Sequence, residues 1–376
     1  MTTRNENMKH VIVIGAGGNI GSHLLPHLAR MKQVSNLTLI DPDSYDATNL
    51  NTQNITVSDV GKRKVFAQAR KLKRINPTLE ITTIALPVDA VPLGVFRSAC
   101  LLACLDSRRA RMQVNRVAVR LGIPWIDAGV EPGGWLARVN VYANALDGPC
   151  LECAWDKEDY RMLEQRYACA AERNPSSFPS NSPSGLGALA ASLQALAVQK
   201  LLDAAACPAL RDTQVLIDAR NQRHFITTFS RSPNCVNEPH RPWRIEVVSG
   251  AARDLTLADI FKVGRKRKGR SPSCGGARSL SMPDHRFGVR LYCPRCGHCQ
   301  DRLRLLRANS ARDLRCPNCS REMWAVGRDT RAELVPSELS YSDLKRSLYS
   351  LGLRDSDVFT IAEGTIKRHF GIALQS

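Results

Sequence analysis

The chain has 376 residues, an ordinary hydrophobic content of 43% and a formal net charge of +18. This length allows a full hydrophobic core and more than one domain. No uninterrupted run of about eighteen apolar residues occurs, so the composition excludes a typical membrane-spanning helix. It predicts a soluble protein without membrane partners.

The cysteine content points to metal or thiol chemistry. No charged-then-apolar secretory signal precedes the first expected strand, which favours a cytoplasmic location. In that compartment thirteen cysteines, several of them in C-x-x-C pairs, are more typical of metal ligands or reactive thiols than of disulfides.

Part of the positive charge lies in residues 262–270, which read Lys-Val-Gly-Arg-Lys-Arg-Lys-Gly-Arg. Ser, Pro and Gly flank this run, and no aromatic side chains are interleaved, so we expect a flexible basic linker. Charge alone predicts non-specific attraction to acidic partners. It does not predict sequence-specific nucleic-acid binding.

The first expected element is a buried parallel strand over residues 9–14, an apolar and β-branched run. It leads into a turn with four glycines, Gly15, Gly17, Gly18 and Gly21, and then into a helix-compatible stretch. Glycine permits the tight turn and lets backbone amides approach an anion. The segment therefore predicts a nucleotide site.

A second strand, residues 37–40, ends at Asp41, where an acid can hold ribose hydroxyls. Polar amides follow it at Asn49, Asn51 and Gln53. The glycine turn and Asp41 alone do not separate NAD from ATP. The amides and the charged residues after them suit a triphosphate and its metal, which a nicotinamide would not need.

Lys62 and Lys64 precede a helical stretch, residues 65–74, and a lysine ammonium suits a phosphate oxygen. Residues 101–105 form another apolar strand, and Asp106 at its carboxyl end can hold the Mg²⁺ of a triphosphate. Taken alone, Lys64 also fits a solvated helix face and Asp106 a helix N-cap. Their joint occurrence favours an ATP site.

At this point the chain resembles the ThiF/MoeB family, whose adenylating domain is shared with ubiquitin-activating enzymes. The resemblance covers about residues 9–240 and begins with the G-x-G-G-x-x-G turn at 15–21. The other matching residues are Asp41, Asp43, Asn49-Leu-Asn51, Gln53, Gly61-Lys62, Lys64, Asn76-Pro77, Asp106, Arg111, Asn115 and Pro124.

The resemblance implies an α/β fold, a Rossmann-like sheet with an ATP-binding glycine turn. It implies an enzyme that uses ATP and Mg²⁺ to adenylate the C-terminal carboxylate of a ubiquitin-like protein and releases pyrophosphate. It assigns catalytic roles to Lys64 and Asp106. The nucleotide contacts would come from the four glycines together with Asp41, Asp43, Asn49, Asn51, Gln53, Lys64, Asp106 and Arg111.

Two departures from the family pattern stand out. Thr52 occupies the position of the arginine in Asn-Leu-x-Arg-Gln, an arginine that touches the phosphates in the family. Either another cation substitutes for it or catalysis is weakened. The family's N-terminal Arg-Tyr-x-Arg-Gln segment, which can lend an arginine to a partner subunit, is not recognisable, so a homodimer stays an open expectation.

Cys150 and Cys153 form a C-x-x-C metal-ligand pair. In the family pattern a second C-x-x-C follows the last strand of the fold, whereas this chain has only Cys235 there. His240 can complete a Cys₃His zinc site, and Glu238 is a poorer candidate because zinc prefers softer ligands. The alternative is a group of ordinary buried thiols.

Cys169 precedes a stretch rich in Pro and Ser, residues 174–185, which predicts a mobile loop. Arg166 and Arg173 flank the thiol and would favour its thiolate form. In the family, the cysteine at this place is the acyl-accepting or sulfur-carrying nucleophile. A buried or incidental cysteine is the alternative.

A second metal candidate consists of two C-x-x-C pairs at ribbon-like separation. The four cysteines are Cys293, Cys296, Cys316 and Cys319. Polar residues dominate between the pairs, so the segment, about 290–325, needs a metal to fold and predicts a zinc ribbon. Cys299 is a surplus ligand or a bystander, and a redox pair is the competing interpretation.

The domain organisation expected from the sequence is an adenylation domain over residues 1–240 and a small α+β module over 241–376 that carries the ribbon. Residues 215–218 and 224–229 predict a hairpin that closes the main sheet. Residues 358–370 predict another, with its turn at Glu363-Gly364.

The leading functional hypothesis is activation of a ubiquitin-like protein, with a thioester on Cys169 and transfer to a conjugating enzyme. Relatives of this kind occur in bacterial ubiquitin-like conjugation operons, some linked to phage defence. The same adenylation could instead serve sulfur transfer in thiamine or molybdopterin synthesis. Two hypotheses assign the chain to other functional classes. One is an NAD-dependent dehydrogenase, and the other is a non-catalytic scaffold that binds a ubiquitin-like protein.

Overall fold

The structure is a computed structural model that describes residues 10–143, 148–168, 182–203, 211–237, 240–263, 278–307 and 314–373. The chain divides into two compact units. Unit 1 runs to Val88 and continues from Phe96 to Pro242. Unit 2 consists of Asp89–Val95 and the chain from Trp243 onward.

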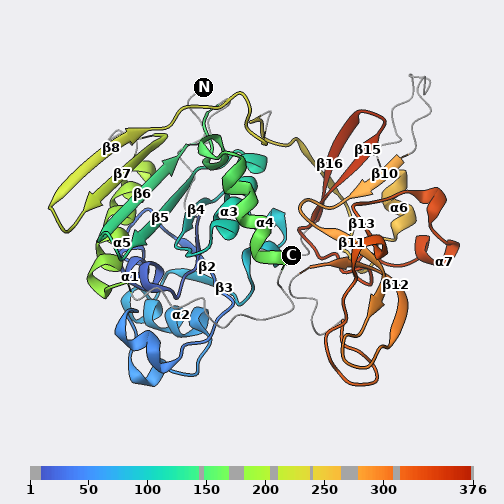
Figure 1. Ribbon diagram of the computed structural model, residues 1–376, viewed down its shortest axis with the longest axis horizontal. Helices are drawn as coiled ribbons and strands as arrows, with labels where there is room; N and C mark the ends of the chain where they lie inside the picture. The colour runs from blue at the N-terminus through green and yellow to red at the C-terminus, as the bar shows by residue number, and fades with distance from the viewer. Residues whose placement is uncertain are drawn as a thin grey trace. The chain divides into compact units, whose positions relative to one another are not determined.

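Unit 1 is built on an eight-stranded sheet with the order β3-β2-β1-β4-β5-β6-β7-β8 (Figure 1). The first five strands along the chain are parallel, and the last three continue the sheet antiparallel. The strands are β1 (His10–Ile14), β2 (Asn36–Ile40), β3 (Glu80–Ile84), β4 (Cys100–Ala103), β5 (Trp125–Glu131), β6 (Leu136–Tyr142), β7 (Thr213–Asp218) and β8 (Arg223–Thr228).

The parallel strands are joined by helices that lie on both faces of the sheet. β1 and β4 are buried almost throughout because both of their faces are covered. One face packs against α1 (Asn19–Leu28), α2 (Lys64–Ile75) and α5 (Ser184–Leu202). The helix α3 (Arg108–Leu121) packs on β4 and β5, and α4 (Lys157–Ala168) follows later in the chain. The expected α/β sheet is confirmed, and β7 and β8 form the expected hairpin at its edge.

By length and composition α5 is apolar enough to cross a membrane. It packs, however, on α1 and on strands β5 and β6, and it buries Ala190, Ala191 and Val198. These contacts are those of a core helix. They match the buried alanine-rich helix that its broken apolar run predicts.

Unit 2 contains a five-stranded sheet with the order β14-β10-β15-β16-β9 and a three-stranded sheet with the order β12-β11-β13. The expected C-terminal hairpin is β15–β16. The elements are β9 (Ile245–Val248), α6 (Leu257–Lys262), β10 (Arg278–Ser281), β11 (Arg286–Tyr292), β12 (Cys299–Leu306), β13 (Thr330–Arg331), β14 (Glu333–Leu334), α7 (Tyr341–Leu344), β15 (Val358–Glu363) and β16 (Ile366–Ile372).

One hydrophobic core joins the two sheets of unit 2. Phe287 of β11 and Leu305 of β12 pack in the same cluster as Phe359 of β15 and Phe370 of β16. A smaller cluster surrounds the cysteine pairs and contains Leu291, Leu314 and Met323. The ribbon segment is therefore part of the unit 2 core and not an appendage.

Candidate nucleotide and metal sites

The glycine turn and Asp106 follow two neighbouring strands of the sheet. β1 pairs with β2 on one side and with β4 on the other. The chain leaves β1 toward β2, while β4 leads away toward β5, so the direction of the strand order reverses between β1 and β4. In open α/β sheets ligands bind beyond the carboxyl ends of strands at such a reversal.

The glycines of the turn are required by close backbone contacts. Gly15 has a φ of +78°, and a Cβ on it would lie 2.4 Å from the carbonyl oxygen of Cys104. A Cβ on Gly21 would lie 2.2 Å from the oxygen of Gly15. Gly18 is the N-cap of α1 and brings no side chain to the helix end. The first-turn amides of α1 are thus available to an anion.

Lys64 crosses the glycine turn as the first residue of α2. A Cβ on Gly17 would lie 2.4 Å from the Cβ of Lys64, so the lysine stem occupies the space that a side chain there would need. The ammonium lies 3.3 Å from a carboxylate oxygen of Asp43, and only 9% of the lysine side chain is exposed. Lys64 is therefore not part of a solvated helix face.

We predict that Gly17→Ala destabilises the nucleotide-free protein by about 1–3 kcal/mol, because the new methyl group overpacks against the Lys64 stem. Gly18→Ala is the matched control, since a Cβ at Gly18 meets nothing closer than 3.5 Å. It should change the free energy of unfolding by less than about 1 kcal/mol. Urea unfolding of both variants measures the difference, and equal destabilisation would contradict this packing.

Asp41, the expected ribose acid, braces the glycine turn in this structure. Its carboxylate accepts hydrogen bonds from the amides of Gly17, at 2.9 Å, and Asp43, at 3.0 Å. The side chain is buried, and desolvation raises the pKa of its carboxyl group. Asp41 thus connects the end of β2 to the glycine turn.

The polar segment after β2 forms a short 3₁₀ helix, η1 (Ala47–Asn51), capped by Asp46. Asn49 closes the capping box, because its side-chain oxygen accepts from the Asp46 amide at 3.1 Å. Asn51 is exposed. The side-chain oxygen of Gln53 is buried without a hydrogen-bond partner among the described residues. A donor on a bound ligand would satisfy it.

Asp106 is exposed at the end of β4. The helix cap is its neighbour Ser107, whose hydroxyl accepts from the amide of Ala110 at 3.4 Å. The N-cap alternative for Asp106 is therefore excluded. An exposed carboxylate at this strand end, close in the sheet to the glycine turn, fits the donor chemistry that Mg²⁺ prefers.

Four metal-ligand side chains converge in unit 1. Their ligand atoms lie within 4.8 Å of one another, and they come from Cys150, Cys153, Cys235 and His240. The Cys150 sulfur is 3.6 Å from that of Cys235 and 3.7 Å from the His240 Nε2 atom. Tetrahedral zinc bonds of about 2.0–2.3 Å would separate ligand atoms by about 3.5–3.8 Å. We name this group metal site 1.

His240 is oriented for metal binding. Its Nδ1 atom lies 2.7 Å from the carbonyl oxygen of Gly148, which fixes the tautomer that leaves Nε2 toward the sulfurs. The hydrogen bond between the two thiols lowers the pKa of Cys153 to about 5 and raises the pKa of Cys150. Burial raises the pKa of Cys235, so Cys153 is the thiol that most readily becomes a thiolate. Glu238, the poorer candidate, lies outside the described residues.

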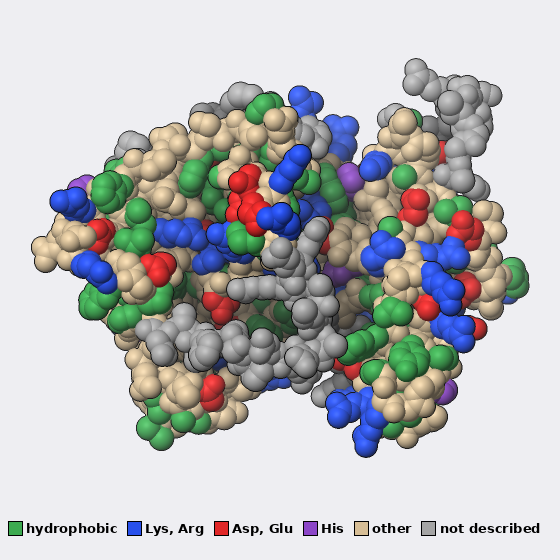
Figure 2. Space-filling view, in the orientation of Figure 1, with side chains coloured by type: hydrophobic (Ala, Val, Ile, Leu, Met, Phe, Trp, Pro, Cys, Tyr) green, Lys and Arg blue, Asp and Glu red, His purple; other side chains and the backbone are tan. Residues whose placement is uncertain are grey.

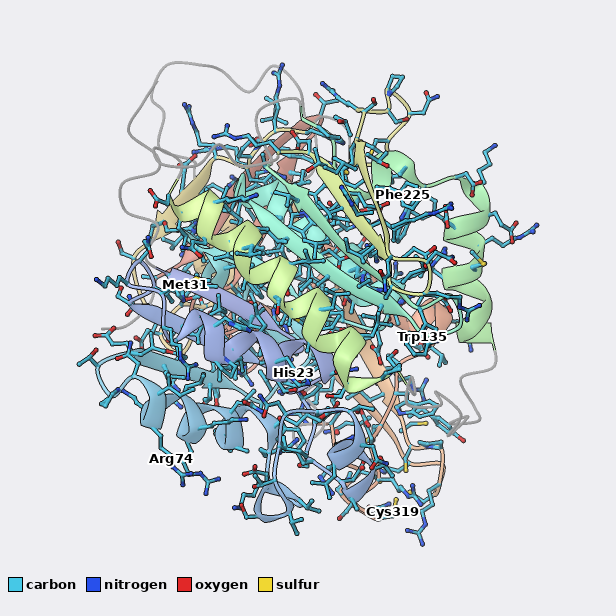
Figure 3. All side chains as sticks on the ribbon, turned by 90° about the vertical axis from the view of Figure 1, so that its left-hand side faces the viewer. His23, Met31, Arg74, Trp135, Phe225 and Cys319 are labelled. Atoms are coloured by element: carbon cyan, nitrogen blue, oxygen red, sulfur yellow. The ribbon has the colours of Figure 1, made fainter. Side chains whose placement is uncertain are left out.

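A second group, metal site 2, lies in unit 2 and comprises Cys293, Cys296, Cys316 and Cys319, with ligand atoms within 4.8 Å of one another. The closest sulfurs are 3.4–3.5 Å apart. Figure 3 labels Cys319. Cys299 is exposed, and its thiol donates to the carbonyl of Gly297 instead of joining the four.

The two halves of metal site 2 repeat one backbone pattern. The amide of Cys293 donates to the His298 carbonyl, and the amide of Cys316 donates to the Arg321 carbonyl, each five residues on. The residues four after each first cysteine, Gly297 and Ser320, both have positive φ, at +71° and +58°. These matching turns aim each cysteine pair at a common point.

Comparison with known proteins identifies the family. A model of the ThiF family matches residues 4–237. The chain belongs to the ThiF family.

Two curated relatives illustrate the similarity. The chain is 30% identical over 148 residues to the adenylyltransferase and sulfurtransferase UBA4 of Yarrowia lipolytica, a match to 39% of this chain and 36% of the relative. It is 28% identical over 182 residues to ubiquitin-like modifier-activating enzyme 5 of Aedes aegypti, a match to 43% and 45% of the two chains. This ThiF-family chain thus spans less than half of the length of these relatives.

A solved structure shares the fold. Escherichia coli MccB, solved with ATP, superimposes on 62% of this ThiF-family chain and 67% of its own, with 24% identity and a TM-score of 0.50. At this identity the likeness shows the fold alone.

Arg111, one of the expected nucleotide contacts, is engaged inside the ThiF-family domain. Its Nε atom donates to a carboxylate oxygen of Asp127 at 2.8 Å, and a second nitrogen donates to the Leu105 carbonyl. Asp127 is fully buried and also accepts from Arg138 at 2.9 Å. Asp127 and Arg138 are not among the residues that the sequence predicts for this site. An acid within the apolar run of β5 was the available signal.

Glu152, between Cys150 and Cys153, was also overlooked. It is buried and accepts hydrogen bonds from the side chains of Asn115, Arg116, Tyr160 and Asn237. Since Asn115 and Arg116 belong to α3 and Tyr160 to α4, this carboxylate ties metal site 1 to both helices. Arg108 and Asp159 form a further ion pair between α3 and α4 at 2.5 Å.

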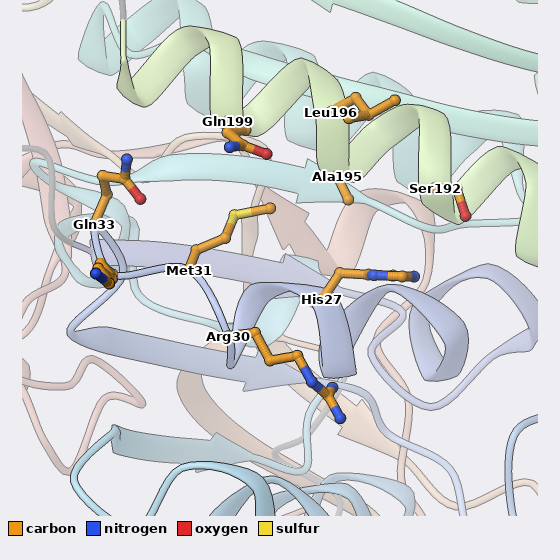
Figure 4. A pocket seen from close by; sticks show the side chains of 9 residues that line it. His27, Arg30, Met31, Gln33, Ser192, Ala195, Leu196 and Gln199 are labelled. Atoms are coloured by element: carbon orange, nitrogen blue, oxygen red, sulfur yellow. The ribbon is translucent and has the colours of Figure 1, made fainter.

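Among the described residues, a pocket of about 530 Å³ opens at the C-terminal end of α1 (Figure 4). His27, Met31 and Gln33 line it opposite Leu196 and Gln199 of α5. It lies away from the glycine turn, which precedes the N-terminus of α1, and it contains none of the expected site residues. Cys169 lies outside the described residues and directly follows α4.

Proposed function

We propose that this protein uses ATP and Mg²⁺ to adenylate the C-terminal carboxylate of a ubiquitin-like protein and then forms a thioester on Cys169. The observation that carries the proposal is the arrangement at the strand-order reversal. The glycine turn follows β1, and the exposed Asp106 carboxylate follows β4, the strand beside it. The buried Lys64 side chain lies at the start of α2, against the glycine turn. The curated relatives named as activating enzymes and adenylyltransferases support it.

In the adenylation step a carboxylate oxygen of the partner attacks the α-phosphorus of ATP. The bond to the bridging oxygen breaks, and pyrophosphate leaves with the electron pair. The first-turn amides of α1 and the Lys64 ammonium would bind phosphate oxygens. Asp106 would hold Mg²⁺, which would supply positive charge against the developing phosphate charge. The Gln53 side-chain oxygen, which is buried without a partner among the described residues, would accept a hydrogen bond from the nucleotide.

In the second step a thiolate attacks the carbonyl carbon of the acyl-adenylate and expels AMP. We assign this thiolate to Cys169 because it follows α4 directly, and α4 is tied to metal site 1 through Tyr160 and Glu152. A conjugating enzyme would then accept the acyl group on its own thiol.

The face of the sheet at β7 and β8 supports the proposal of a protein partner. Leu216 and Phe225 lie side by side on β7 and β8, on the face away from α5, and Phe225 is 49% exposed. Figure 3 shows Phe225 at the edge of the sheet. An apolar surface of this kind suits docking of a folded protein.

We further propose that metal sites 1 and 2 each bind zinc, and that site 2 is a zinc ribbon. The donor sets fit, since three thiolates with an imidazole and four thiolates are both typical of structural zinc. Zinc supplies no reaction step here. It fixes the ends of the segments that carry its ligands.

Sulfur transfer to a carrier protein is the second candidate, because one relative is named a sulfurtransferase as well as an adenylyltransferase. Both candidates begin with the same adenylate. They differ in whether Cys169 carries an acyl group or a sulfur atom.

We predict that Cys169→Ala leaves ATP–pyrophosphate exchange with the ubiquitin-like partner nearly unchanged, because exchange needs no thiol. The same variant should lose the thiol-sensitive covalent adduct with the partner, seen as a band shift on non-reducing gels. Cys299→Ala, which removes an exposed thiol in unit 2, should keep the adduct.

An adduct that persists in the Cys169 variant would place the nucleophile elsewhere. A wild-type protein that exchanges pyrophosphate, forms no adduct and yields a thiocarboxylated partner with a sulfur donor would establish the second candidate.

A further inference from the structure

One face of the zinc-ligand segment of unit 2 is turned to solvent. Tyr292 and Trp324 form an antiparallel pair, with amide–carbonyl hydrogen bonds of 2.7 and 2.8 Å in the two directions. Successive residues of a strand point to opposite faces. Leu291 and Met323 are buried around metal site 2, so Tyr292 and Trp324 point away from it and are 45% and 48% exposed.

Charged residues continue this face in both directions. Arg290 precedes Tyr292 by two positions on β11. Glu322 precedes Trp324 by two positions, and its backbone forms an antiparallel bridge with that of Arg315. All three are exposed. We name the set of Arg290, Tyr292, Arg315, Glu322 and Trp324 the outer ribbon face. Asp301 lies beside Arg290, at 3.6 Å.

The segment of sequence that carries this face has an unusual charge composition. Residues 286–331 contain eleven arginines, no lysine and four acidic residues. Among the described residues, the exposed Arg295, Arg321 and Arg328 pair with no carboxylate. A surface selected only for solubility would use lysine as well. The planar guanidinium group binds phosphates through two nitrogens and stacks on flat rings.

We propose that the outer ribbon face binds single-stranded nucleic acid without sequence preference. Hydrogen-bonded strand partners have Cα atoms about 5.5 Å apart, so Tyr292 and Trp324 present two adjacent aromatic surfaces. Unpaired bases stack on such surfaces, and nearby arginines contact the phosphates. A duplex keeps its base faces stacked inside and fits this face poorly. Figure 2 shows Lys and Arg side chains on the surface of both units, interspersed with Asp and Glu.

The test measures binding of a fluorescein-labelled oligothymidylate of about 16 nucleotides to the zinc-loaded protein of 376 residues by fluorescence anisotropy. Tyr292→Ala and Trp324→Ala should each weaken binding about tenfold or more, because each removes a stacking surface without changing the charge. Tyr292→Phe keeps the aromatic ring and should bind the oligothymidylate about as tightly as the wild type. Arg290→Gln and Arg315→Gln, which remove the two arginines of the face, should each make the slope of log binding constant against log salt concentration shallower by about 0.7.

Tyr341→Ala is the matched control, since Tyr341 is 73% exposed and belongs to α7, not to the ribbon strands. This variant should bind as the wild type does. An unchanged zinc content shows that a variant keeps its fold. The proposal is wrong if the oligothymidylate does not bind, if both alanine variants bind as tightly as the wild type, or if inorganic polyphosphate competes as well per phosphate. It is equally wrong if a duplex of the same length binds more tightly, or if only a protein ligand occupies the face.

Discussion

Asp106→Ala is expected to reduce ATP–pyrophosphate exchange by about a thousandfold or more. Asp106 is the exposed carboxylate at the end of β4, and in the proposed reaction it is the protein ligand of Mg²⁺. A metal that neutralises developing phosphate charge contributes several kcal/mol to the transition state, and about 1.4 kcal/mol corresponds to a factor of ten in rate. The fold should be unaffected, because the side chain is not part of the core.

A binding measurement separates the metal from the fold. ATP with Mg²⁺ should raise the melting temperature of the wild-type protein more than ATP with EDTA does, since ligands that bind only the native state stabilise it. In Asp106→Ala the two conditions should give equal shifts. Ser107→Ala is the matched control at the next position: it removes the α3 cap and costs about 1 kcal/mol of stability, but it should keep the Mg²⁺ dependence. A Mg²⁺ dependence retained in the Asp106 variant would remove Asp106 from the metal site.

The nucleotide edge could be predicted from the sequence because its signals are local. Strand, glycine turn, helix and strand-end acid follow one another within about thirty residues, and each has its own composition. The packing of Lys64 across Gly17 could not be predicted in the same way. It joins residues 47 positions apart and depends on how α2 begins beside the turn. The burial of Lys64 therefore emerges only from the fold.

The buried polar residues beside the candidate sites are the main feature that the sequence did not predict. Asp127 lies in a strand whose other residues, apart from Glu131 at its end, are apolar or small. Its role depends on ion pairs with Arg111 on α3 and Arg138 on β6. Glu152 occupies an x position of a C-x-x-C pair, where composition gives no signal. A buried carboxylate needs several donors, but the sequence does not show which helices supply them.

The ribbon segment shows both what residue spacing predicts and what it does not. Spacing alone predicts its four cysteines, and the structure brings those side chains together. The spacing did not reveal that Phe287 and Leu305 belong to the core of unit 2. That contact depends on the pairing of β10 with β15 and of β16 with β9, which are distant in the sequence.

Metal analysis of the purified protein is expected to find two zinc ions per chain, one at each metal site. Cys316→Ser should lose the ion of site 2, because three thiolates leave the tetrahedral site open. Binding free energies of structural zinc reach about 10–16 kcal/mol, far more than the small cluster around Leu291 and Met323 supplies. The ribbon should therefore unfold. Cys150→Ser should lose the other ion and leave the ribbon intact.

The consequences of losing site 2 should spread through unit 2 and stop there. Phe287 and Leu305 connect the ribbon strands to the unit 2 core, so amide hydrogen exchange should rise in β11 and β12 and also in β15 and β16. Site 1 should keep its ion, because its four ligands all belong to unit 1. Cys299→Ser should retain both ions, since that thiol lies outside the four. One zinc ion in the wild type would mean that one of the two sites does not close, and two ions retained in Cys316→Ser would show that Cys316 is not a ligand.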